Sequence, residues 1–131
     1  MMRGTSIVLF LSAILAGQAA AQEGHPMTGS WVGDWGTSTQ DRHRVVVIIE
    51  WTDARLHATI NPGPDAIQAN VATANPEDWS LHLEATGRDS RGRAVNYVVD
   101  GTIDDLGTYN RTLAGTWNVD GNPGDFSITR Q

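Results

Sequence analysis

The chain has 131 residues, of which 15 are Asp or Glu and 9 are Arg, so its formal net charge at pH 7 is −6. It contains neither lysine nor cysteine. An acidic small protein is repelled by phosphate groups, which argues against nucleic acid and anionic membrane surfaces as partners. Without cysteine there is no disulfide framework and no thiolate chemistry.

The first 21 residues have the layout of a secretory signal peptide. A short basic start precedes an apolar stretch over residues 7–16 and a group of small residues that ends at Ala21. The apolar stretch is too short to anchor a protein in a bilayer. We expect removal of residues 1–21, a flexible tail over 22–28, one domain over 29–131, and a periplasmic or secreted product with no membrane anchor.

The remainder shows alternation of apolar and polar residues, which is typical of half-buried strands. Clusters of Gly, Pro, Asn and Asp divide it into hairpin-length pieces. The expected strands lie near residues 30–36, 43–51, 55–61, 66–73, 79–86, 93–103, 110–118 and 124–130. A sandwich would also fit, but a barrel removes exposed strand edges. The pattern predicts an all-β fold, an eight-stranded antiparallel up-and-down β-barrel.

Alternation also assigns side chains to the two faces of each strand, and all five tryptophans fall on the apolar face, which we expect to point inward. The second segment breaks the rule, because Val46 and Ile48 place apolar side chains on its other face as well. We expect either a loop or the N-terminal tail to cover them, or a second copy of the chain in a homodimer formed through this strand.

The opening Gly29-Ser30-Trp31 resembles the Gly-x-Trp start of the lipocalins and their calycin relatives. The resemblance implies a barrel floor closed by Trp31, with Arg130 of the last strand packed across it and Gly29 beside them. The chain departs from lipocalins in lacking their disulfides and the helix after the barrel. The avidins open similarly, but Gly33 stands where that family has an asparagine, which argues against biotin binding.

The inward aromatic residues are the candidate ligand-binding residues, because rings on the walls of a barrel can enclose a flat or apolar molecule. The alternative is that these rings fill a narrow interior. The four histidines show no metal-ligand spacing, so we expect no metal and no cofactor. The candidate residues are Trp35, Trp51, Trp79, Tyr97 and Trp117.

Two functions are compatible with this sequence. The first is an exported, non-catalytic barrel that binds a small apolar or aromatic molecule in its interior. The second is a protein-binding module with a solid core, such as a periplasmic protease inhibitor that acts through residues 22–27. An enzyme is not expected, because no nucleophile, base and oxyanion stabiliser can be assembled from these spacings.

Overall fold

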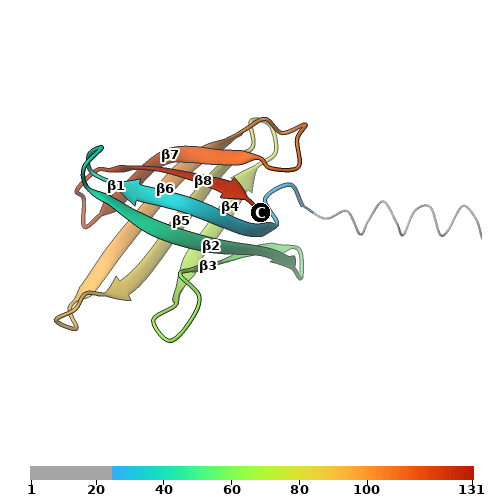
Figure 1. Cartoon of the computed structure of the whole chain (residues 1–131). Helices are drawn as coiled ribbons and strands as arrows, with labels where there is room; N and C mark the ends of the chain where they lie inside the picture. Colours follow the sequence, from blue (N-terminus) through green and yellow to red (C-terminus); the bar gives the residue numbers. More distant parts are fainter. Residues whose placement is uncertain (1–24) are drawn as a thin grey trace, which may run out of the picture.

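A computed structural model describes residues 25–131, which form a closed barrel of eight antiparallel strands in sequential order (Figure 1). The predicted fold class is therefore confirmed. None of these residues forms a helix long and apolar enough to cross a membrane. The strands are β1 (Gly29–Gly36), β2 (Arg42–Thr52), β3 (Arg55–Ile60), β4 (Ile67–Asn75), β5 (Ser80–Arg88), β6 (Ala94–Asp104), β7 (Thr112–Val119) and β8 (Asp125–Arg130).

The barrel closes where β8 pairs with β1, in a register that runs from Trp31 opposite Arg130 to Gly36 opposite Asp125. Arg42 of β2 reinforces this closure from the outside. Its guanidinium lies 2.5 Å from Asp34 of β1 and also forms an ion pair with Asp125 of β8. One side chain thus connects the first, second and last strands.

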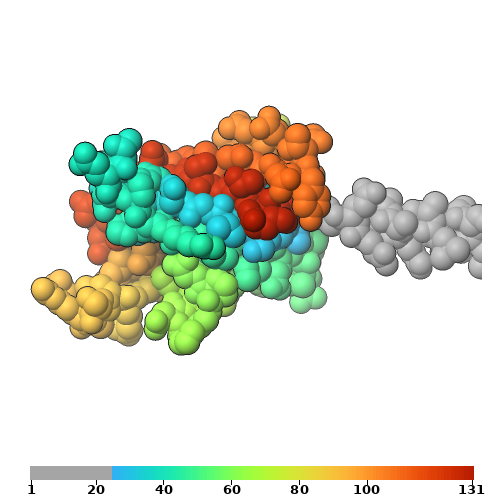
Figure 2. Space-filling view, in the orientation of Figure 1, coloured from blue at the N-terminus to red at the C-terminus, as the bar shows by residue number. Residues whose placement is uncertain are grey.

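The loops divide between the two ends of the barrel (Figure 1). One end, which we call the mouth, carries the loops over residues 37–41, 61–66, 89–93 and 120–124. The other end, the floor, carries the loops over 53–54, 76–79 and 105–111, together with the residues that lead into β1. Figure 2 shows the loops over 61–66 and 89–93 as separate protrusions.

Large apolar side chains occupy the interior. Trp31, Leu113 and Val45 are completely buried, and Trp117 retains only 2% of its exposure. The other large side chains that are fully buried are Met27, Ile49, Ile60, Leu81, Leu83, Ile128, Val47 and Val99. The prediction that alternation separates an inward apolar set from an outward polar set is confirmed for those of these residues that lie in strands.

Close strand packing explains why two inward positions are glycine. A Cβ atom on Gly33 would lie 1.9 Å from the carbonyl oxygen of Ser127, and one on Gly115 would lie 2.0 Å from that of Asp100. In both cases the obstacle is backbone of a neighbouring strand, which cannot move aside as a flexible side chain can. These positions therefore permit the tight coiling of the barrel wall.

The floor is built around Trp31. Its indole Nε1 donates a hydrogen bond to the carbonyl oxygen of Met27 at 2.9 Å. Arg130 lies opposite Trp31 in the register and packs its side chain against Gly29. However, the guanidinium carbon of Arg130 lies over the ring of Tyr109, 5.2 Å from its centroid, and this is its cation–π contact.

The residues just before β1 correct one expectation. We expected residues 22–28 to form a flexible tail, yet Met27 is completely buried. Arg111 also donates a hydrogen bond to the carbonyl oxygen of Pro26 at 2.9 Å. These contacts hold residues 25–28 on the barrel, because they fill and cap its floor. Residues 22–24, and the expected signal peptide over 1–21, lie outside the described residues.

The apolar outer face of β2 is half-buried at Val46 and Ile48. Asn61, the first residue of the loop after β3, bonds to the backbone of Val46 in both directions. Its amide N donates to the Val46 carbonyl oxygen at 2.7 Å, and its Oδ1 accepts from the Val46 amide at 3.0 Å. These bonds continue the β2–β3 ladder at its edge, so cover of this face by a loop or the tail and a homodimer through β2 both stay predictions.

We predict that Trp31→Ala lowers the free energy of unfolding by about 3–5 kcal/mol, because it removes a fully buried ring and leaves a cavity. Urea denaturation followed by far-ultraviolet circular dichroism would measure the change. Tyr109→Ala is the control, since that ring is 68% exposed, and it should cost less than about 1 kcal/mol. Equal costs for the two substitutions would contradict the central place of Trp31.

Candidate functional site

The junction of β3 and β4 is the shortest in the barrel. The two strands pair only at Thr59 with Gln68 and at Ile60 with Ile67, close to the mouth. The register of β4 with β5 then shifts between Ala69 and Val71, which marks a β-bulge. Towards the floor, β3 and β4 therefore separate without a ladder between them. We call this junction the seam.

The separation leaves a cleft of about 600 Å³ along the seam, which we call the seam cleft. This volume lies in the range of ordinary small-molecule sites. Its inner wall is apolar, because Leu56 of β3 and the small side chains of Ala72 and Ala74 of β4 line it. The cleft is lined by His25, Trp51, Ala54, Arg55, Leu56, His57, Ala69, Asn70, Val71, Ala72, Thr73, Ala74 and Pro76.

Trp51 lies at the floor end of the seam cleft, and its position corrects the prediction that it points into a closed interior. It is the second-last residue of β2, beyond the packed core, and it is 45% exposed. Its ring stacks on His25 with centroids 4.8 Å apart. His25 also meets the ring of Trp79 edge-on at 5.3 Å. Desolvation by these neighbours lowers the pKa of His25.

The other three predicted ligand-binding residues lie at the mouth. Trp35 stacks on Trp117 with centroids 5.7 Å apart, and Tyr97 meets Trp117 edge-on at 6.4 Å. Phe126 packs against the same indole at 5.7 Å. Thus the five predicted residues do not form one cage, because Trp51 and Trp79 belong to the opposite end.

The mouth cluster contains one buried polar atom that has no partner among the described residues. The indole Nε1 of Trp117 is buried and makes no hydrogen bond within residues 25–131. Burying an N–H group without a partner costs free energy. Nevertheless, the surrounding rings fill this end with aromatic side chains, so the cluster primarily completes the core.

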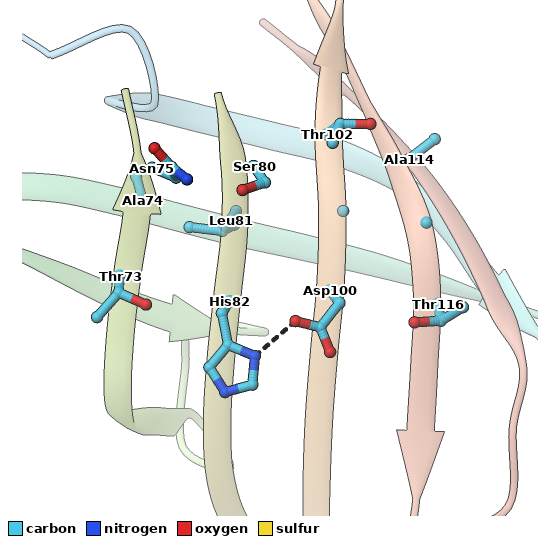
Figure 3. Close-up of a pocket in the computed structure, with 12 residues that line it drawn as sticks. Thr73, Ala74, Asn75, Ser80, Leu81, His82, Asp100, Thr102, Ala114 and Thr116 are labelled. Atoms are coloured by element: carbon cyan, nitrogen blue, oxygen red, sulfur yellow. Dashed lines mark hydrogen bonds and ion pairs between the residues drawn. The ribbon is translucent and has the colours of Figure 1, made fainter. Parts of the chain in front are cut away.

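A shallow groove of about 440 Å³ lies outside the barrel, over β4 to β7 (Figure 3). Thr73, His82, Asp100 and Thr116 follow one another across these four strands. His82 Nδ1 lies 2.5 Å from Asp100, and its Nε2 lies 2.9 Å from Glu84. Hydrogen bonds to Glu84 and then Asp100 raise the pKa of His82. Alternation along these strands places His82, Glu84 and Asp100 on the outer face, but the sequence alone does not show that they pair.

This outer cluster does not provide a catalytic triad or a metal centre. Both ring nitrogens of His82 are engaged by carboxylates, so neither is available to accept a proton from a hydroxyl. Among residues 25–131, no three His, Asp or Glu side chains are arranged to bind a metal ion. The cluster connects β5 with β6 and leaves the seam cleft as the candidate binding site.

No protein-family model matches the sequence, and no curated protein or solved structure matches it at a significant level. The site is therefore defined by its own geometry.

The His82 cluster leads to a prediction about pH. Because the folded-state pKa of His82 is raised, its pairing stabilises the fold below the unfolded value of about 6.5 and is lost as pH rises through the folded value. Glu84→Gln and Asp100→Asn should each lower the pKa of His82, which NMR titration of its ring would measure. An unchanged pKa in both variants would show that the two carboxylates do not hold its proton.

Proposed function

We propose that this protein is an exported, non-catalytic binding protein for a small apolar or aromatic molecule, and that the molecule occupies the seam cleft. The observation that carries the proposal is Trp51, a large ring that is 45% exposed beside the apolar wall of a 600 Å³ cleft. An exposed tryptophan beside a concave surface offers a stacking platform for a flat ligand. The periplasmic or secreted location rests on residues 1–21.

The filled interior supports moving the proposed site from the barrel axis to the seam. Trp31, Trp117 and Leu113 occupy the inside, and each is at most 2% exposed. A ligand on the axis would have to displace packed side chains, which is costly in an interior of normal density. The seam cleft is already open, and its wall of alanines leaves the necessary space.

The relationship to lipocalins belongs to this proposal as well. The closed eight-stranded barrel and the buried Trp31 beside Gly29 and Arg130 support it. A lipocalin-like protein with a filled axis and an open side would bind its ligand between strands. The protein would then share the lipocalin barrel but bind its ligand at a different place.

A neutral aromatic probe tests the proposal. N-phenyl-1-naphthylamine should bind with a saturable rise in fluorescence, and Trp51→Ala should weaken binding roughly tenfold, because the stacking surface is lost. Tyr109→Ala is the matched control, since it removes an exposed ring at the same end but outside the cleft, and it should leave binding unchanged. Circular dichroism should show that both variants are folded. No saturable binding by the folded wild type would refute the proposal.

The separated strands favour a second candidate function, the binding of another protein. Residues 55–58 of β3 and 71–75 of β4 have no ladder partners across the seam, so an extended segment of a partner could pair with either edge. The inhibitor hypothesis instead used residues 22–27. The described part of that segment is held on the barrel, because Met27 is buried and His25 stacks on Trp51.

Hydrogen exchange distinguishes the two candidates. A small aromatic ligand should change tryptophan fluorescence without protecting backbone amides of the strand edges, because it contacts side chains. An added strand should slow the exchange of amides within residues 55–58 or 71–75, since their N–H groups would gain partners. Protection by a protein from the same compartment, with no probe binding, would favour the second function.

A further inference from the structure

The seam cleft has an unusual set of charged side chains for this chain. Its ionisable residues are Arg55, His25 and His57, and its lining contains no Asp or Glu. Yet acidic residues outnumber arginines in the chain by 15 to 9. The outer groove over β4 to β7 contrasts with it, since Asp100 lines that groove. An anion in the seam cleft would therefore meet hydrogen-bond donors, and the lining contains no carboxylate to repel it.

Arg55 is the fixed positive charge of this cleft. It is the first residue of β3, immediately after the tight turn formed by Asp53 and Ala54, and its side chain is exposed. Within residues 25–131 the arginine ion pairs involve Arg42 and Arg93, and none involves Arg55. The nearest acids along the chain, Glu50 and Asp53, are not part of the lining. Its guanidinium is therefore available to an anion.

We propose that the ligand of the seam cleft is an amphipathic anion, a flat apolar body that carries one carboxylate-like or sulfonate-like group. This inference rests on the proposed function and specifies its ligand. The body would lie against Trp51 and the apolar wall, and the anionic oxygens would meet Arg55. An arginine suits this role, because its planar fork donates two parallel hydrogen bonds to such oxygens.

The two histidines of the cleft also favour an anionic ligand. His57 lies on β3 two residues from Arg55 and lines the cleft with it. His25 stacks on Trp51 and presents its ring in the same cleft. A neutral imidazole can donate one hydrogen bond, and a protonated one can donate two. Both residues therefore suit a ligand whose polar group accepts hydrogen bonds.

A pair of probes with one aromatic skeleton provides the test. 1-Anilinonaphthalene-8-sulfonate is the anionic counterpart of neutral N-phenyl-1-naphthylamine. The wild type should bind the sulfonate more tightly, and Arg55→Gln should weaken its binding about fivefold, the scale of a partly exposed charge pair. The same substitution should change binding of the neutral probe by less than about twofold. Raising the salt concentration should weaken only the sulfonate.

Arg91→Gln is the matched control. Arg91 is an exposed arginine in the loop after β5, at the mouth, so its loss changes the net charge equally but leaves the seam cleft intact. Equal binding of the two probes, or equal effects of Arg55→Gln and Arg91→Gln, would overturn the anionic ligand and leave the proposed function standing. Failure of both probes to bind the folded wild type would instead refute the proposed function.

Discussion

Ring closure by strand pairing is the constraint on which this structure depends. Every strand must give one edge to each neighbour, and β1 must meet β8, or two edges remain open to water and to other chains. Arg42 secures that meeting by pairing with carboxylates on both strands. The seam between β3 and β4 meets the constraint least, with only two residue pairs. The place of weakest closure is also the place where the barrel offers a cleft.

Core packing and site formation are linked through the sizes of side chains. Every strand except β4 contributes at least one large side chain that is fully buried, whereas β4 packs Ile67 only partly against the core and otherwise contributes Ala69, Ala72 and Ala74. Small side chains bury little apolar surface, so β4 gains less from lying against β3 than its neighbours gain from their contacts. The core thus depends least on β4, and the unpaired part of the seam can stay open without loss of the core.

Alternation in the sequence was sufficient to predict the number, order and closure of the strands, because each inward set is apolar and each link is short. It failed where the position of a residue in the inward–outward alternation, which we call its parity, does not determine whether its side chain is buried. Val71 shares parity with Ala69, but the bulge between them turns Val71 outward, and it is 37% exposed. Trp51 has inward parity but lies past the core, and Trp79 adopts a left-handed conformation before β5 begins. The seam itself depends on the register between strands, which no local pattern contains.

The two histidines with shifted pKa values act on stability in opposite directions. The contribution of His82 to stability decreases as pH rises from about 6.5 to its raised folded-state pKa, because the unfolded chain gives up its proton before the folded protein does. The lowered pKa of His25 reduces stability as pH falls below about 6.5, because the unfolded chain then binds a proton while His25 in the folded protein stays neutral. His82 on the barrel wall thus limits the pH range of highest stability from above, and His25 at the floor limits it from below. Their joint contribution is greatest in mildly acidic to neutral solution.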